Sequence, residues 1–161
     1  NKLSTVFLFL IVKNKIDFIQ KWEYPQVVEV WEASVRATHH FLNEEDIQYF
    51  KPLILNTYLD AVNLRAYRNH EKEIIAFLGV DQSNLEMLFV HPDYRGQGIG
   101  TLLLQYAIKD LKIDKVDVNE QNEQAVGFYE HYQFKTQSRS ELDATGKPYP
   151  ILHMQLEKFG T

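Results

Sequence analysis

The segment that most limits what this chain can fold into is Val90-His-Pro-Asp-Tyr-Arg-Gly-Gln-Gly-Ile-Gly100, between an apolar strand-like stretch and a helical pattern. Gly96, Gly98 and Gly100 have no Cβ, so the backbone there can turn sharply and approach a ligand closely. A helix that begins near Gly98 adds unpaired N–H groups and the positive end of its dipole. A strand, a glycine-rich loop and a helix N-terminus in this order predict an anion-binding site.

The spacing of the glycines narrows the choice of anion. Gly-x-Gly-x-Gly is not the dinucleotide fingerprint Gly-x-Gly-x-x-Gly, and no Gly-Lys-Ser/Thr follows as a Walker loop requires. The segment does match Arg/Gln-x-x-Gly-x-Gly/Ala, at Arg95, Gly98 and Gly100. It thereby resembles the acetyl-CoA pyrophosphate loop of the GNAT superfamily of acetyltransferases. The alternative interpretation is a strand-to-helix turn that is glycine-rich only for tight packing.

A second motif follows the first at the separation typical of GNAT proteins. It reads Asn122-x-x-Ala125-x-x-Phe128-Tyr129 and precedes Tyr132-Gln133-Phe134. GNAT members commonly carry Asn-x-x-Ala-x-x-Phe/Leu-Tyr and then a Gly-Phe pair, so Gln133 stands where glycine is usual. That departure concerns the helix C-terminus, where glycine normally supplies a left-handed cap. The resemblance covers residues 61–156 well and the first 20 residues poorly.

The resemblance implies acetyl-CoA as the co-substrate. A backbone N–H near Leu88 would polarise the thioester carbonyl, and Arg95 would add a charged contact to a phosphate. Asn122 would contact the cofactor or only cap the helix that follows it. The cofactor-binding residues expected from the resemblance are Leu88, Val90, Arg95, Gly96, Gln97, Gly98, Ile99, Gly100, Thr101 and Asn122.

The resemblance also implies catalytic residues. Tyr129 matches the general acid that hydrogen-bonds the departing CoA sulfur, although an aromatic residue at this helical spacing is also typical of a core. An acceptor amine with a pKa of ~10.4 must first lose a proton. Glu86 and Asp117, on strands expected to border the cofactor, are candidate bases or structural ion-pair partners. The chain has no cysteine, which excludes a cysteine-linked acetyl-enzyme and favours direct attack in a ternary complex.

The acceptor site is expected between the first two helices and the late hairpin. The adjacent residues His39 and His40 point apart on a helix and no third ligand is evident, so no metal is predicted. Arg36 would meet a carboxylate of the acceptor or simply pair with Glu32. Compact bacterial GNATs acetylate antibiotics, polyamines, amino acids, or protein lysines and N-termini. The substrate-binding candidates are Trp31, Arg36, His39 and Tyr149.

Hydrophobic patterning predicts one domain over residues 1–161, with 1–15 as an N-terminal extension or extra strand that contains the apolar run 5–12. That run is too short to span a membrane, which takes about 20 apolar residues. By the resemblance, the fold is a mixed α/β (α+β) one: a mostly antiparallel twisted sheet with a splay between two central strands and about four flanking helices. The expected strands are 16–22, 61–67, 73–80, 85–90, 115–119, 134–141 and 151–157, and the expected helices are 25–36, 43–58 with a kink or split at Pro52, 98–111 and 124–132.

Composition bounds the remaining functional classes. A formal net charge of −5 argues against nucleic acid as a partner, and no membrane partner is expected. The lack of cysteine favours a reducing, cytoplasmic location, and the exposed closing strands suggest a homodimer. The resulting prediction is an N-acetyltransferase that moves acetyl from acetyl-CoA to a primary amine. The alternative is a non-catalytic acyl-CoA-binding sensor or interaction domain of the same family.

Overall fold

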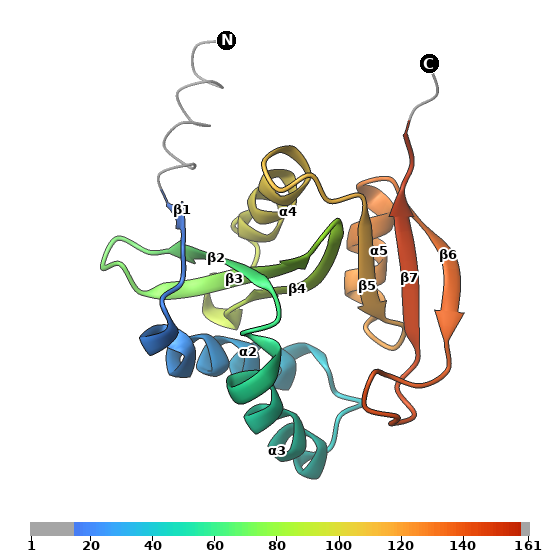
Figure 1. Cartoon of the computed structure of the whole chain (residues 1–161), viewed down its shortest axis with the longest axis horizontal. Coiled ribbons are helices and arrows are strands. Elements are labelled where there is room, and N and C mark those ends of the chain that lie inside the picture. Colours follow the sequence, from blue (N-terminus) through green and yellow to red (C-terminus); the bar gives the residue numbers. More distant parts are fainter. Residues whose placement is uncertain (1–14, 159–161) are drawn as a thin grey trace.

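The protein, described over residues 15–158 by a computed structural model, is built around one seven-stranded sheet (Figure 1). The strand order is β1-β2-β3-β4-β5-β7-β6. All neighbouring strands are antiparallel except the central pair β4 and β5, which is parallel. The strands are β1 (Ile16–Asp17), β2 (Asn63–Arg68), β3 (Ile74–Asp81), β4 (Asn84–Val90), β5 (Lys115–Asn119), β6 (Phe134–Ser140) and β7 (Ile151–Leu156).

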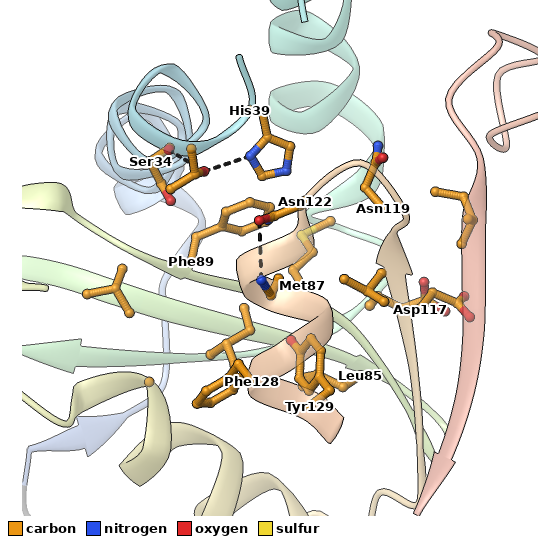
Figure 2. A pocket seen from close by; sticks show the side chains of 18 of the residues that line it. Ser34, His39, Leu85, Met87, Phe89, Asp117, Asn119, Asn122, Phe128 and Tyr129 are labelled. Atoms are coloured by element: carbon orange, nitrogen blue, oxygen red, sulfur yellow. Dashed lines mark hydrogen bonds between the residues drawn. The ribbon is translucent and has the colours of Figure 1, made fainter. Parts of the chain in front are cut away.

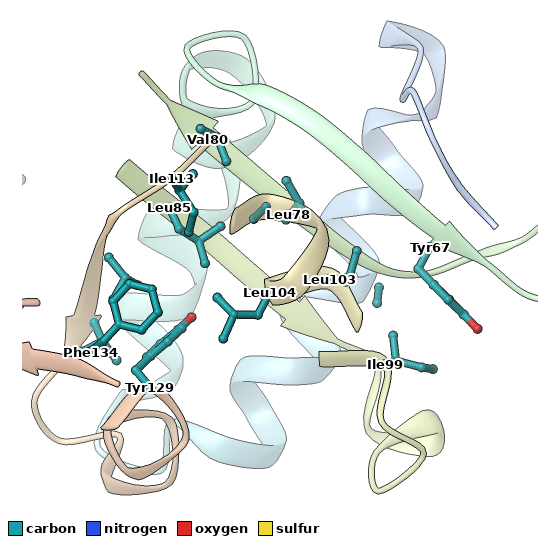
Figure 3. Packing of buried hydrophobic residues seen from close by; sticks show 14 of the residues in the cluster. Tyr67, Leu78, Val80, Leu85, Ile99, Leu103, Leu104, Ile113, Tyr129 and Phe134 are labelled. Atoms are coloured by element: carbon teal, nitrogen blue, oxygen red, sulfur yellow. The ribbon is translucent and has the colours of Figure 1, made fainter. Parts of the chain in front are cut away.

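Helices cover both faces of the sheet (Figure 1). α2 (Tyr24–Thr38) and α3 (Glu44–Leu53) pack on one face, and α4 (Ile99–Lys109) and α5 (Glu123–His131) on the other. β3 is therefore buried on both sides and reads as a continuous apolar run, with Phe77 in the α2 core and Leu78 in the α4 core. Figure 3 shows the α4 core, in which side chains of α4 contact those of α5 and the sheet.

The predicted splay between central strands is confirmed. Among the described residues, β4 and β5 pair only at Asn84 with Lys115 and at Leu85 with Val116. The register between β3 and β4 shifts at Glu86, which is the extra residue of a β-bulge. A bulge bends its strand, and this one lies where the pairing with β5 ends. The two strands diverge from there, which opens the centre of the sheet.

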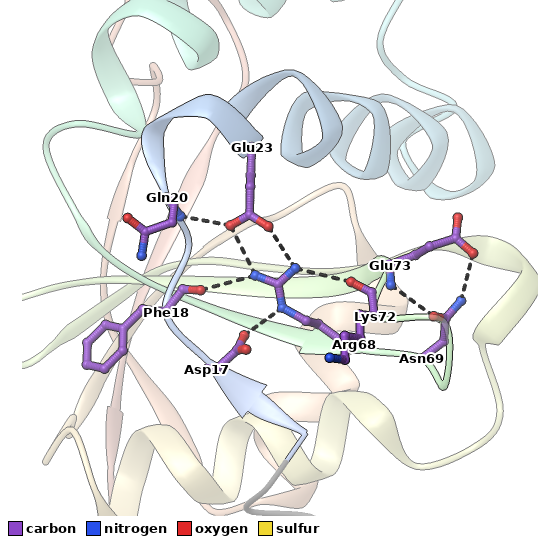
Figure 4. Close-up of polar contacts among 8 residues, drawn as sticks. All are labelled: Asp17, Phe18, Gln20, Glu23, Arg68, Asn69, Lys72 and Glu73. Carbon is purple, nitrogen blue, oxygen red and sulfur yellow. Dashed lines mark hydrogen bonds and ion pairs between the residues drawn. The ribbon is translucent and has the colours of Figure 1, made fainter.

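Most predicted elements are found within two residues of their expected ends, but the strand at 16–22 is wrong beyond Asp17. Arg68 binds Asp17 at 2.7 Å, the Phe18 carbonyl at 3.2 Å and Glu23 at 2.7 Å, so the chain turns around one guanidinium instead of extending (Figure 4). The turn ends in the 3-10 helix η1 (Lys21–Glu23). The prediction for residues 1–15 and their apolar run lies almost entirely outside the described residues.

Two predicted helix ends have clear local causes. The second helix is split near Pro52, as expected. Its α-helical part, α3, ends at Leu53, and the π-helical turn η2 (Ile54–Tyr58) follows directly. Gln133 takes the place of the usual glycine after α5 and adopts φ 71°, the left-handed conformation that the position requires.

Within residues 15–158, no helix is both long and apolar enough to cross a bilayer.

Candidate active site

The divergence of β4 and β5 opens a cleft of about 980 Å³, within the usual range of small-molecule sites. Its walls come from the glycine loop, the two diverging strands, α5, the C-terminal end of α2 and the β6–β7 connection (Figure 2). Of the predicted cofactor residues, all except Gln97 line it. Of the predicted catalytic residues, Tyr129, Glu86 and Asp117 all line it.

The glycine loop has a backbone that only glycine adopts readily. Gly96 and Gly98 have φ values of +77° and +79°, in the left-handed region. A Cβ at either position would meet no atom within 4 Å, so the loop needs glycine for its backbone and leaves open space beside it. Gly98 is also the N-cap of α4. The glycines therefore shape a shallow, open cradle at a helix N-terminus.

The N–H groups of this cradle are free to bind a ligand. Within residues 15–158, no backbone or side-chain acceptor takes the N–H of any residue from Gly96 to Thr101. Directly after this segment, the N–H of Leu102 donates to the Gly98 carbonyl at 3.0 Å. Consecutive unpaired donors at the positive end of a helix dipole suit a diphosphate. The residues present thus fit the pyrophosphate of acetyl-CoA.

The open edge of β4 supplies further donors. The N–H of His91, just after β4, donates to the Ile75 carbonyl at 2.8 Å. Because the N–H groups of a strand alternate in direction, that of Phe89 also faces β3, and those of Leu88 and Val90 face the gap towards β5. The Leu88 N–H is therefore free of β3, and its role in polarising a thioester carbonyl stays a prediction.

Asn122 performs the capping role that its motif implied. It is the N-cap of α5, and its Oδ1 accepts the N–H of Ala125 at 3.3 Å (Figure 2). Asn122 also lines the cleft. A direct contact with the cofactor stays a prediction.

Tyr129 has its ring in the core and its hydroxyl at the cleft. The ring packs edge-on against Phe134, as Figure 3 shows, and against Phe128. The residue is 6% exposed. No partner among residues 15–158 hydrogen-bonds the hydroxyl. Burial raises the pKa of Tyr129 well above its usual value of 10. The hydroxyl is therefore protonated at neutral pH. The expectation that Tyr129 belongs to the core is confirmed, and its role as a general acid stays a prediction.

The two candidate bases lie side by side at the bulge. Asn84 Nδ2 donates to Glu86 Oε1 at 2.8 Å and to Asp117 Oδ2 at 3.2 Å. Partial burial raises the pKa of Glu86, and the nearby carboxylates of Asp117 and Asp81 raise it further. Glu86 therefore holds a proton more readily than an ordinary glutamate does.

Sequence reasoning missed two polar residues in the same cleft wall. His153 Nδ1 lies 2.6 Å from Asp117 Oδ1, and His153 Nε2 lies 2.7 Å from Ser140 Oγ. His153 faces Asp117 directly across β5 and β7. The alternation of residues along a strand predicts on which face of the sheet His153 lies. Its contact with Asp117 depends on the register between β5 and β7, and no sequence signal predicted that register.

The predicted acceptor residues separate into two groups. Trp31, His39 and Tyr149 line a smaller adjoining cavity of about 190 Å³ between α2, α3 and the strands. Tyr149 donates its hydroxyl to Asp46 on α3, which ties the β6–β7 connection to that helix. Arg36 lines neither cavity. It binds Glu32 at 2.9 Å and Glu44 at 2.6 Å, so the alternative ion-pair interpretation describes it.

His39 presents a free ring nitrogen to the cleft. Thr38 Oγ1 lies 2.8 Å from the Ser34 carbonyl, to which its one proton must go, and 2.7 Å from His39 Nδ1 (Figure 2). Nδ1 must therefore carry the ring proton, and Nε2 is an acceptor. Burial, helped by the charge of His40, lowers the pKa of His39 to about 4, so the ring is neutral at physiological pH.

Comparisons with known proteins agree with this geometry. A family model described as an acetyltransferase (GNAT) domain matches residues 36–158. The peptidyl-lysine N-acetyltransferase YjaB of Escherichia coli is 38% identical over 82% of this chain and 89% of its own length. The protein of that name from Salmonella typhimurium is 37% identical over 82% of this chain and 90% of its own length.

Solved structures show the same architecture. The solution structure of apo-form YjaB from E. coli superposes with a TM-score of 0.81 and 36% identity, covering 91% of this chain and 97% of that one. The PaiA N-acetyltransferase of Thermoplasma acidophilum, solved with coenzyme A, shares the fold at a TM-score of 0.63 and 20% identity, covering 87% and 97%. The cradle of free amides, the splayed sheet and these relatives all lead to the same conclusion. The chain belongs to the GNAT family of N-acetyltransferases, which transfer acetyl from acetyl-CoA to amines.

Proposed function

We propose that this chain acetylates the ε-amine of lysine in a protein or peptide, by direct attack of the amine on acetyl-CoA in a ternary complex. The observation that carries the proposal is a cleft with unpaired amides at one side and carboxylates at the other, joined through the gap between β4 and β5. Two relatives more than 35% identical over most of the chain are named as peptidyl-lysine acetyltransferases. No comparison supports the alternative of a non-catalytic sensor.

On the cofactor side, the chain would bind acetyl-CoA, which supplies an activated thioester. The amides of residues 96–101 and the guanidinium of Arg95 would hold the diphosphate. The Leu88 N–H would donate a hydrogen bond to the thioester oxygen as negative charge develops on it. The Tyr129 hydroxyl would donate a hydrogen bond to the departing sulfur. Full proton transfer from tyrosine to a thiolate is uphill by roughly 2 kcal/mol from their reference pKa values, so a hydrogen bond describes this role best.

On the acceptor side, the smaller cavity has the chemistry that a lysine side chain needs. Its apolar walls, from Trp31, Phe50 and Met87, suit four methylenes, and carboxylates of Glu86 and Asp143 lie in the same lining to attract an ammonium. The net charge of −5 agrees with a cationic acceptor. The homodimer and the cytoplasmic location stay predictions; β6 is a free edge of the described sheet and would be the natural contact.

An amine panel tests the proposal. Release of free CoA is followed with lysine-containing peptides, Nα-acetylated or free, and with spermidine, free amino acids and an aminoglycoside at equal concentration. We expect the highest kcat/KM with a peptide whose only amine is a lysine ε-amine. A preference for spermidine or an aminoglycoside, with lysine peptides inert, would contradict the lysine assignment while leaving acetyl transfer intact.

A further inference from the structure

We propose that His153 is the general base that removes the acceptor's proton, acting through the hydroxyl of Ser140 and held in place by Asp117. The inference deepens the proposed function and rests on it. None of these three residues belongs to the glycine loop or the Asn122 motif. They come from three neighbouring strands, β5, β7 and β6, and all three line the cleft.

The contacts form one continuous line across the sheet. Asp117 Oδ1 lies 2.6 Å from His153 Nδ1, and Ser140 Oγ lies 2.7 Å from His153 Nε2. The other Asp117 oxygen is 3.2 Å from Asn84 Nδ2, which also binds Glu86 at 2.8 Å. The line therefore begins at the bulge, where the sheet opens, and continues across the cleft wall.

Counting protons gives each group its role. A carboxylate can only accept, so the proton between Asp117 and His153 belongs to Nδ1. That leaves a lone pair on Nε2, and the nearby Ser140 hydroxyl must donate to it. The lone pairs of Ser140 Oγ are then directed elsewhere, and Ser140 is part of the cleft lining. An acceptor ammonium at the cleft can donate to that oxygen.

The proton transfer balances in one concerted step. One N–H proton of the acceptor ammonium passes to Ser140 Oγ while the Ser140 proton passes to His153 Nε2. The products are a neutral amine, an unchanged serine and an imidazolium whose Nδ1–H still donates to Asp117. Among the described residues, the carboxylate of Asp117 accepts this Nδ1–H and the charge of Glu86 also favours the imidazolium.

This arrangement distinguishes His153 from Glu86. Glu86 has its Oε1 bonded to Asn84 and lies in both cavities, so it is placed to attract the ammonium. His153 has a lone pair on Nε2, a donor chain leading to it and a carboxylate that fixes its tautomer. A base oriented by a third group is the usual design for activating an incoming nucleophile.

The test compares His153→Gln with the wild type and with His70→Gln, a change at an exposed histidine outside both cavities. Two acceptor peptides are used, one with lysine and one with its aminooxy analogue, whose terminal nitrogen is already neutral at the assay pH. With lysine we expect His153→Gln to lower kcat about 100-fold. With the aminooxy peptide it should match the wild type within about threefold, and CoA affinity by calorimetry should not change. Asp117→Asn should show the same acceptor dependence.

Three outcomes would overturn the inference. Wild-type turnover of the lysine peptide by His153→Gln would remove the base role. An equal loss with both peptides, at unchanged CoA affinity, would assign His153 to positioning instead of deprotonation. An acetyl group found on Ser140 by mass spectrometry after incubation with acetyl-CoA would make Ser140 a nucleophile. A wild type that acetylates no lysine peptide but does acetylate another amine contradicts the proposed function and not this inference, which is then tested with that amine and a neutral analogue of it.

Discussion

Arg95 Nη2 donates to Gln124 Oε1 at 2.6 Å, so the glycine loop is linked to the first turn of α5. The two residues come from the two motifs of the chain, which meet at the mouth of the cleft. Arg95 directly precedes the free amides of residues 96–101, and its side chain is exposed. Both the charge and the position of Arg95 are therefore available to a phosphate.

Two substitutions separate the effect of the charge of Arg95 from the effect of its position. Arg95→Ala removes the charge and should weaken CoA binding about tenfold, since a hydrogen bond to a charged group contributes about 1.5 kcal/mol or more. Gln124→Ala keeps the charge and should change the affinity by less than about threefold. Calorimetry at two salt concentrations measures both, and the wild type should lose more affinity at high salt than Arg95→Ala does. Equal effects of the two variants would assign the contact a purely structural role.

Tyr129→Phe should lower kcat about 100-fold while leaving CoA affinity and stability nearly unchanged. The ring, which packs against Phe134, is kept, and the lost hydroxyl has no partner among residues 15–158. The matched control is Tyr132→Phe, whose hydroxyl lies 2.8 Å from Thr101 Oγ1 and is not part of the cleft lining. Steady-state kinetics measures kcat, and urea denaturation measures the free energy of unfolding, for both variants and the wild type. Unchanged turnover in Tyr129→Phe would exclude the hydroxyl from the chemistry.

Arg68→Met should lower the free energy of unfolding by about 3 kcal/mol, because it leaves the buried carboxylate of Glu23 without its cation. Hydrogen bonds from Arg68 are the main reason that the pKa of Glu23 is lowered. Adding Glu23→Gln to Arg68→Met should restore part of the loss. Urea denaturation of the single and double variants measures this coupling. A double variant less stable than Arg68→Met would show that Glu23 stabilises the fold without Arg68.

Folding stability should fall between pH 6.5 and pH 4 in a way that depends on His39. The unfolded chain protonates His39 near pH 6.5, whereas burial delays this to about pH 4 in the folded protein. The unfolded state therefore binds more protons in this window, and stability decreases as the pH drops, by at most roughly 3 kcal/mol. His39→Gln should flatten this part of the pH dependence and His70→Gln should not. Identical slopes in the two variants would show that His39 is not buried as described.

Short sequence patterns predicted the parts of the molecule whose structure depends on interactions between residues close together in the sequence. The glycine loop, the Asn122 cap and the meander of β2, β3 and β4 follow from backbone freedom, capping and alternation, and all were expected. The early strand failed because Arg68, about 50 residues away, turns the chain at Phe18. His153 was missed for the same kind of reason, since its partner Asp117 is 36 residues away and meets it only through the pairing of β5 with β7.

If free amides at the start of α4 bind the diphosphate, a negative charge placed among them should prevent CoA binding. Gly98 is unsuitable because its φ of +79° would strain any other residue. Gly100 is suitable, since a Cβ there would make only ordinary contacts, the nearest at 3.8 Å from Phe128. Gly127, on the surface of α5 with open space around it, provides the matched control.

Calorimetric titration of CoA into Gly100→Glu and Gly127→Glu is therefore the most direct measurement. We expect Gly100→Glu to unfold like the wild type and to lose CoA binding by at least about 100-fold, because a carboxylate takes the place of the phosphate in the cradle. Gly127→Glu should bind CoA as the wild type does. Wild-type affinity in a folded Gly100→Glu would contradict the account, because the diphosphate would then bind elsewhere.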